Sequence, residues 1–344
     1  MSVNEDIKYD AKLDGILDAA TGAGTGKSRS LGSVVTLCLL AVAVVLPFVA
    51  QGFVVFQLTM VMVYGIAIMG LNILTGFNGQ FSLGHSAFFA IGAYTAAILM
   101  ESFGVSYVWT LPAAGLTAFV AGFLFGLPAL RLEPIYLALA TFALAVAMPQ
   151  FLKLTPFEHW TGGVQGIVIL KPDAPFGLPL SQDQWLYLFT LGVGFGLYLA
   201  ARNIIASRTG RAIQAIRDNP IAARAMGINL SLYKTLTFGV SAFYTGVAGA
   251  LSAIVVQFVA PDSYTLVLAV AFLVGMVIGG VGWLPGSLIG GAFILFVPNI
   301  AEGVSKGLSG AVYGIILLLI IYIAPSGVGG LLHKTADYFA RRRK

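Results

Sequence analysis

Charged residues are scarce in this chain. Asp, Glu, Lys and Arg make up 10% of its 344 residues, whereas hydrophobic residues make up 58% and the mean hydropathy is +0.91. An ordinary soluble domain has about 25% charged residues. The composition therefore excludes a soluble globule and predicts a polytopic membrane protein. Its apolar runs are long and continuous, which favours spanning helices over the alternating strands of a barrel.

Residues suited to metal, redox or hydrolytic chemistry are also few. The chain has one cysteine, Cys38, and three histidines, so we expect no intrachain disulfide and no metal site. The sequence shows no arrangement of Ser, His and Asp and no paired carboxylates that would predict an enzyme. The segment TGAGTGKS at 21–28 is similar to a phosphate-binding loop, but Thr21 occupies the required glycine position and an apolar span follows. We therefore expect no nucleotide site in this chain.

Apolar windows of about 20 residues predict the membrane topology. They indicate an all-α polytopic fold of about ten transmembrane helices, at 31–50, 53–74, 85–101, 107–130, 134–152, 184–202, 235–258, 264–282, 284–303 and 308–325. Lys and Arg accumulate in cytoplasmic loops, and basic residues flank the first span and follow the last. We therefore expect both termini in the cytoplasm.

The same reading predicts the domain organisation. We expect a cytoplasmic N-terminal tail, a membrane domain and a basic cytoplasmic tail, at 1–30, 31–330 and 331–344. The alternation of spans puts the long connection at 153–183 outside the membrane and the loop at 203–234 in the cytoplasm.

The cytoplasmic loop carries the most specific local pattern. Its stretch SRTGRAIQAIRDNPIAARAMGINLSLYK holds one acid and five basic residues, Arg208, Arg211, Arg217, Arg224 and Lys234. Thr209 to Asp218 has an amphipathic helical pattern. Asn219 and Pro220 can then cap and open a second helix, which Gly227 ends in a left-handed conformation, with Asn229 beyond it. Such a helix could dock in the groove of a partner, or the loop could be a solvated connector that fixes topology.

A second set of candidate residues is polar and lies inside the apolar sequence. It clusters between the second and third predicted spans, at Asn72, Asn78, Gln80, Ser82 and His85. Polar groups are costly in hydrocarbon and face the bundle interior or a water-filled path, so this set is a candidate transport pathway or gate. Hydrogen bonding between helices, without any substrate contact, is the alternative.

Three sequence blocks carry a family resemblance. They are GFNGQFSLGHSAFFAIGAYTAA, GRAIQAIRDNPIAARAMGINLSLYKTLTFGVSAFYTGVAGAL and the glycine-rich GGVGWLPGSLIGGA at 279–292. In order and spacing they resemble the LivM-type permease family of branched-chain amino acid ABC importers, over roughly residues 31–335.

The resemblance implies a multi-pass permease subunit of a bacterial plasma (inner) membrane. Its implied partners are a LivH-type permease, two cytoplasmic ATPase subunits and an extracytoplasmic solute-binding protein. ATP and Mg would bind the ATPases, with no cofactor and no catalysis in this chain. The 203–234 loop would be the ATPase-coupling loop. The pattern of that region is Glu-Ala-Ala, three residues, then Gly, which Ala222, Ala223 and Gly227 fit while Ile221 replaces the Glu. Arg211, Arg217 and Arg224 would pair with acidic residues of the ATPase or anchor the topology.

The function that the resemblance implies is import of branched-chain or other apolar amino acids by alternating access, driven by the separate ATPases. Related permeases handle urea, short amides or aromatic acids, so these remain alternative substrates. Two other classes stay open from the residues themselves. An ion-coupled secondary transporter would use a gradient alone, and a membrane scaffold would move nothing.

Overall fold

The computed structural model describes residues 41–129, 134–177, 179–304, 309–323 and 327–329. The tails predicted at 1–30 and 331–344 lie outside these ranges, as does Cys38. Contacts divide the chain into two units, Met1–Gln51 and Gly52–Lys344. In the first unit, residues 41–49 form a helix.

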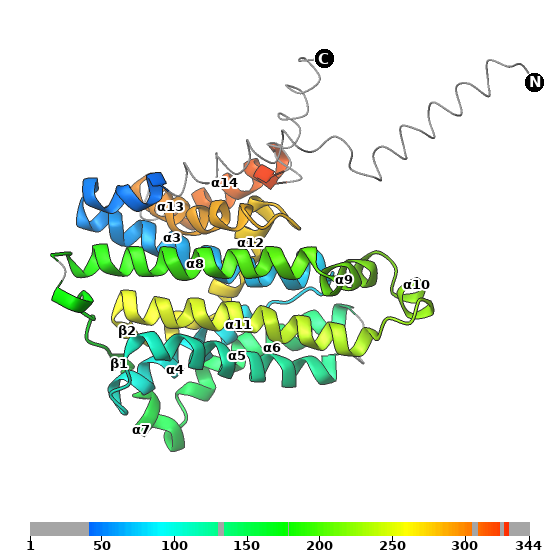
Figure 1. The fold of residues 1–344 in the computed structure, drawn as a ribbon, viewed down its shortest axis with the longest axis horizontal. Helices are drawn as coiled ribbons and strands as arrows, with labels where there is room; N and C mark the ends of the chain where they lie inside the picture. Colours follow the sequence, from blue (N-terminus) through cyan, green and yellow to red (C-terminus); the bar gives the residue numbers. More distant parts are fainter. Residues whose placement is uncertain (1–40, 130–133, 178, 305–308, 324–326, 330–344) are drawn as a thin grey trace, which may run out of the picture. The chain divides into compact units, whose positions relative to one another are not determined.

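The second unit is almost entirely helical (Figure 1). Its longer helices are α3 (Gly52–Leu71), α4 (His85–Glu101), α5 (Tyr107–Ala129), α6 (Pro134–Leu152), α8 (Gln182–Ala206), α9 (Arg208–Asp218), α11 (Leu230–Val256), α12 (Leu266–Gly279), α13 (Gly286–Val304) and α14 (Ser309–Ile323). The short helices are η2 (Thr155–Phe157), α7 (Glu158–Thr161), η3 (Pro175–Gly177), α10 (Pro220–Ala225) and η4 (Pro261–Tyr264). A π-helix, η1 (Asn72–Phe77), continues α3, and β1 (Ile167–Val168) pairs antiparallel with β2 (Phe258–Val259).

The helix α11 forms the centre of this unit, and it packs against α5, α4 and α3. Glycines allow the close approach. A Cβ added to Gly249 would lie 2.0 Å from the carbonyl oxygen of Phe89 on α4, and one added to Gly246 would lie 2.3 Å from the Cβ of Ala118 on α5. Small residues permit such backbone contact between membrane helices, which is how they stabilise packing without a hydrophobic driving force. The hairpin of α12 and α13 packs against α3 in turn.

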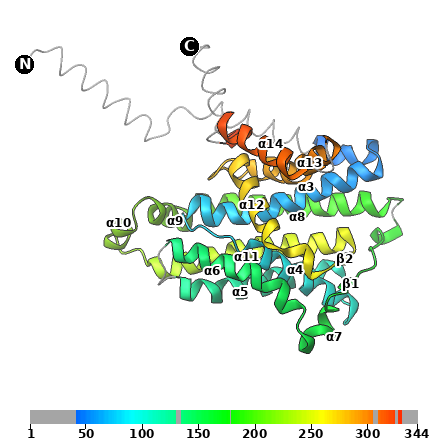
Figure 2. The same ribbon diagram turned by 180° about the vertical axis from the view of Figure 1, so that it is seen from behind.

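The connections gather at two opposite ends of the helices (Figures 1 and 2). One end carries α9 and α10, and the other carries α7, β1 and β2. At the second end, the β1–β2 pair and an ion pair of Lys153 with Asp262 fasten the 153–183 connection to the residues after α11. The two long connections thus lie at opposite ends of the helices, and the assignment of one end to the outside and the other to the cytoplasm stays a prediction.

Seven of the described helices are long and apolar enough to cross a membrane. They lie in Gly52–Phe77, Tyr107–Pro128, Ile135–Leu152, Gln182–Ala206, Leu230–Val256, Pro261–Gly279 and Gly286–Gly303. The protein is thus a multi-pass, α-helical membrane protein, as predicted. The three further spans predicted at 31–50, 85–101 and 308–325 each contain helix where they are described, but the count of ten and the side of the termini stay predictions.

Two predicted boundaries need correction. The cytoplasmic loop was expected at 203–234, but α8 extends to Ala206 and α11 begins at Leu230, so the loop is 207–229. The span predicted at 53–74 extends further as well, because the π-helix continues α3 and the apolar helix runs from Gly52 to Phe77. Ser207 and Asn229, which cap α9 and α11, account for the first correction.

Candidate functional site

The predicted cytoplasmic loop is a pair of short helices, α9 and α10. Ser207 caps α9, because its side-chain oxygen accepts a hydrogen bond from the N–H of Gly210 at 3.4 Å. The apolar face of α9, formed by Ala212, Ile213 and Ile216, is buried, while its arginines are exposed. The predicted amphipathic helix is therefore confirmed, and its apolar face holds the loop against the bundle.

Asn219 and Pro220 separate the two helices as predicted. The Oδ1 atom of Asn219 accepts hydrogen bonds from the N–H groups of Ile221 and Ala222 at 3.1 and 3.0 Å. Pro220 occupies the first helical position, where no intrahelical N–H is needed. Asn219 and Pro220 thus end α9 and start α10 within two residues of chain.

The predicted stop of α10 is also present. Gly227 has a φ of 82°, and its N–H donates to the carbonyl of Arg224 at 3.0 Å. The N–H of Ile228 donates to the carbonyl of Ala223 at 3.1 Å, which completes a Schellman motif. Asn229 then caps α11 by accepting a backbone N–H of its first turn. The loop is thus tightly folded by its own caps.

The exposed face of α10 differs from the expected one. Ala222 is exposed, but Ala223 keeps only 4% of its surface, so it supports the loop from within and presents no face to a partner. Ile221 and Met226 are instead 82% and 84% exposed. The sequence pattern gave Ile221 only as the residue in the place of the Glu. Two large apolar side chains at the tip of a polar loop form a candidate contact surface.

Arg217 points back into the protein. Its Nη1 donates to the carbonyl of Gly76 in the π-helix at 2.8 Å, and its Nε and Nη2 donate to Oδ1 of Asp218 at 3.1 and 3.0 Å. Arg211 also bonds within the chain, through a contact of 3.3 Å with the carbonyl of Ala206. Arg224 is exposed. Of the three arginines predicted to meet an ATPase, Arg217 thus binds the membrane-spanning bundle itself.

Asn72, the first residue of the π-helix, clamps the glycine-rich turn between α12 and α13. Its Oδ1 accepts the N–H of Gly282 at 2.8 Å, and its Nδ2 donates to the carbonyls of Gly280 and Trp283 at 3.3 and 3.1 Å. The Asn72 side chain is buried and uses both its donor and acceptor groups. The hydrogen bonds of Asn72 are therefore those of the alternative, in which polar residues link helices.

Gln80 and Asn78 lie just beyond the π-helix. The Nε2 of Gln80 donates to the carbonyl of Lys234 in the first turn of α11 at 3.1 Å. The amide of Asn78 is buried, and neither its nitrogen nor its oxygen has a hydrogen-bond partner among the described residues. Gln80 thus connects the segment after the π-helix to the N-terminal part of α11.

Ser82 and His85 belong to a buried chain of hydrogen bonds. The hydroxyl of Ser241 on α11 donates to the carbonyl of Gly70 at 2.6 Å, so it accepts from Nε2 of His85 at 2.7 Å. Nδ1 of His85 then accepts from the Ser82 hydroxyl at 3.2 Å, whose oxygen accepts the N–H of Gly84. This arrangement assigns a neutral imidazole with its proton on Nε2. These hydrogen bonds link α4 and α11 to the last turn of α3.

One residue of each predicted set, Arg217 of the loop and Asn72 of the polar cluster, meets the other set in one place. We call it the loop–bundle joint, and it comprises the π-helix at Asn72–Phe77, Arg217 and the turn Gly280–Trp283. The sequence pattern did not predict the carbonyl of Gly76, because backbone acceptors carry no sequence signal. It also did not predict Ser241, which lies 156 residues from its partner His85. In the described part of the chain, no three His, Cys, Asp or Glu residues come together.

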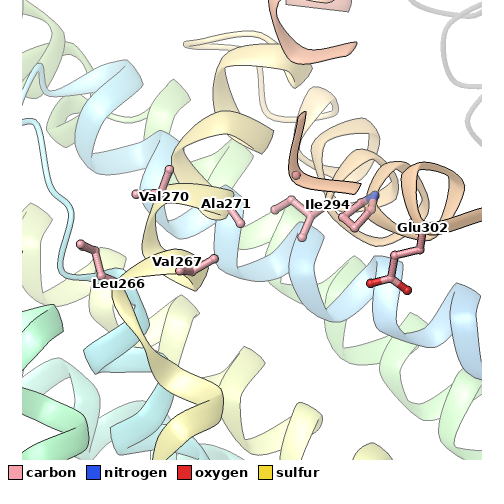
Figure 3. A pocket seen from close by; sticks show the side chains of 8 residues that line it. Leu266, Val267, Val270, Ala271, Ile294 and Glu302 are labelled. Carbon is pink, nitrogen blue, oxygen red and sulfur yellow. The ribbon is translucent and has the colours of Figure 1, made fainter. Parts of the chain in front are cut away.

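A cavity of about 410 Å³ lies between α12, α13 and α14 (Figure 3). Apolar side chains line most of it, and the Glu302 carboxylate lies at one end (Figure 3). Val267 and Val270 on α12 face Ile294 on α13 across it. The hairpin that Asn72 clamps at its turn therefore also forms two walls of this cavity.

Comparison with known proteins identifies the family. Residues 53–321 match the family described as branched-chain amino acid transport system / permease component. The chain belongs to this permease family. The match covers every element of the loop–bundle joint.

Individual relatives within the permease family agree. The high-affinity branched-chain amino acid transport system permease proteins LivM of Salmonella typhimurium and Escherichia coli are each 34% identical over 270 residues, 72% of this chain and 63% of the relative. The LivH permease of Escherichia coli is 24% identical over 296 residues, 78% of this chain and 91% of LivH. The chain thus spans less than two thirds of the length of the LivM relatives. No solved structure matches the chain.

Proposed function

We propose that this protein is the permease subunit of an ATP-driven importer of branched-chain amino acids in a bacterial inner membrane. Family membership supports this proposal, because the LivM and LivH relatives are named as permeases of such systems. The partners would be a LivH-type permease, two cytoplasmic ATPase subunits that bind ATP and Mg, and an extracytoplasmic solute-binding protein. The chain itself would have no catalytic role.

The observation that carries the proposal is the exposed apolar tip of α10. Ile221 and Met226 extend from a rigid, doubly capped helix, and the exposed Arg224 lies between them in sequence. An apolar anchor with a neighbouring charge suits a partner groove that is apolar with an acidic rim. The ATPase groove is such a partner in this proposal.

The mechanism follows from the position of α10. It lies between α8 and α11 in sequence, and α9 packs against both of them. ATP binding would draw the two ATPases together, and α10 would move with them. The movement would then reach α8 and α11 and open the permease pair towards the binding protein, and hydrolysis would reset it. In this proposal α10 makes different contacts with the two ATPase states, and that difference shifts the equilibrium between the two states of the permease.

The test is purification of the tagged protein from native membranes in its wild-type and Met226→Asp forms. We expect an ATPase and a second permease to accompany the wild type, and the variant to lose the ATPase while keeping the second permease. Ala223→Arg is the poorer variant, since Ala223 is buried and the change would disrupt the loop. The matched control is Leu170→Asp, because Leu170 is 85% exposed in the connection at the opposite end.

Uptake of labelled leucine into proteoliposomes completes the test. We expect uptake that needs ATP and the co-purified ATPase. Preference for urea, a short amide or an aromatic acid over leucine would move the substrate to a related class. Uptake driven by an ion gradient without ATP, by the protein alone, would refute the importer and favour a secondary transporter.

A further inference from the structure

Arg217 is the contact through which the loop reaches the bundle interior. Its Nη1 bonds to the Gly76 carbonyl at 2.8 Å, while Asp218 holds the other side of the guanidinium. The aliphatic stem lies on Gly79, where an added Cβ would be 2.8 Å from the Cγ of Arg217. The head of the side chain thus contacts the π-helix at Gly76, and its stem contacts the segment that follows at Gly79.

Gly76 brings three groups into one small volume. A Cβ added there would lie 2.1 Å from the Oδ1 of Asn72 and 2.6 Å from the N atom of Gly282. The Nη1 of Arg217 lies 4.0 Å from the position of a Cβ on Gly282. The arginine, the amide and the turn are therefore close neighbours, and in a close-packed interior a displacement of one would act on the others.

Asn72 extends this contact to α12 and α13. Its three hydrogen bonds hold the turn between them, and Gly279 and Gly286 bring the two helices together directly above it. A Cβ added to Gly279 would lie 2.1 Å from the carbonyl oxygen of Gly286, so the two helix ends behave as one rigid unit. The walls of the cavity in Figure 3 belong to these helices.

We propose that Arg217 and Asn72 are positioning residues that relay movement of the α9–α10 loop, through the π-helix, to the α12–α13 hairpin. The loop thereby changes the cavity between these helices, in addition to moving α8 and α11. The π-helix is the element that changes state, because π-helical turns are rare, occur frequently at functional sites and bond differently from the α-helix that precedes them. This inference rests on the proposed function, since α10 must be moved by the ATPases.

The experiment uses the full importer, with its ATPases, second permease and binding protein, in proteoliposomes. The measured quantity is the amount of leucine taken up per ATP hydrolysed, for Arg217→Ala, Asn72→Ala and the double variant. We expect each single change to lower this ratio on the order of tenfold, within the usual range of coupling between sites. The double variant should fall no further, because both residues act in one relay. The ATPases should still co-purify with all three.

Arg208→Ala is the matched control. Arg208 is also an exposed arginine of α9, at the opposite end of the helix from Arg217. We expect its ratio to equal that of the wild type. An unchanged ratio in Arg217→Ala, or single effects that multiply in the double variant, would overturn the relay. A wild type without ATP-dependent uptake would instead reject the proposed function.

A conservative variant keeps the test open if Arg217→Ala does not assemble. Arg217→Lys retains the charge and one donor for the Gly76 carbonyl, but it cannot bind Gly76 and Asp218 with several N–H groups at once. We expect it to assemble and to give a ratio between those of the wild type and Asn72→Ala. A wild-type ratio in both Arg217→Lys and Asn72→Ala would count against the relay.

Discussion

Gly79 lies beside the loop–bundle joint, where both its backbone conformation and its lack of a side chain matter. It has a φ of 74°, which L residues rarely adopt, and the stem of Arg217 occupies the space where a Cβ would stand. From the sequence, the glycines of this segment either loosen the backbone or let it pack closely. The structure shows that its lack of a side chain is what lets the arginine approach.

Gly79→Ala should therefore destabilise the protein more than a comparable change elsewhere. The left-handed backbone alone costs an alanine about 1–2 kcal/mol, and the clash with Arg217 adds to it. Gly104→Ala is the control, because Gly104 has a φ of 61° but nothing within 4 Å of an added Cβ. Thermal unfolding of the purified protein in detergent measures both. Equal losses for the two variants would show that Arg217 does not fill this space.

Residues outside the loop illustrate what local patterns leave out. His85 was a candidate from its polarity alone, and its partner Ser241 lies 156 positions away in sequence. The carbonyl of Gly70, which orients that serine, is a backbone group and is invisible in a side-chain pattern. Four of the five predicted polar residues, Asn72, Gln80, Ser82 and His85, bond within the chain, so a pathway role for them stays a prediction.

At the scale of elements, α10 is defined by its caps more than by its contacts. The pair Asn219 and Pro220 and the stop at Gly227 were all predicted, because caps act within three or four residues of chain. The direction in which α10 faces was not predicted. A helix of six residues has too little periodicity to show that Ala223 turns inward while Ile221 and Met226 turn out.

Asn219→Ala should loosen α10 while leaving the rest of the bundle intact. The change removes two hydrogen bonds, and loss of an N-cap costs about 1 kcal/mol, or roughly a fivefold rise in local opening. Hydrogen exchange should then speed up at 221–226 and remain unchanged in the centre of α11. The control is Asn229→Ala, which should affect the first turn of α11 instead. Faster exchange throughout the unit would show that α10 supports the whole fold.

The whole molecule has two chemically different ends. One carries the loop with its arginines and the joint, and the other carries the β1–β2 pair and the 153–183 connection. The positive-inside tendency assigns the arginine-rich end to the cytoplasm. The proposed importer requires this orientation, because its ATPases and its solute-binding protein would meet opposite ends.

Cysteine labelling tests this orientation. In a Cys38→Ser background, Leu170→Cys should react with a membrane-impermeant maleimide added to intact cells, because Leu170 is 85% exposed at the outer end. Met226→Cys, at 84% exposure, should react only after the membrane is permeabilised. Because the two side chains are almost equally exposed, a difference in labelling would report the side of the membrane on which each one lies. The reverse pattern would invert the topology and remove α10 from any cytoplasmic partner.

The sequence by itself determined the protein class, the approximate spans and the capped helices of the loop. Each depends on composition or on interactions within a few residues, and these are present in the chain before it folds. Only the tertiary structure decided that the Gly76 carbonyl receives Arg217 and that Asn72 holds the turn at Gly282. These contacts join segments 141 and 210 residues apart through backbone groups, so packing of the helices alone could bring them together.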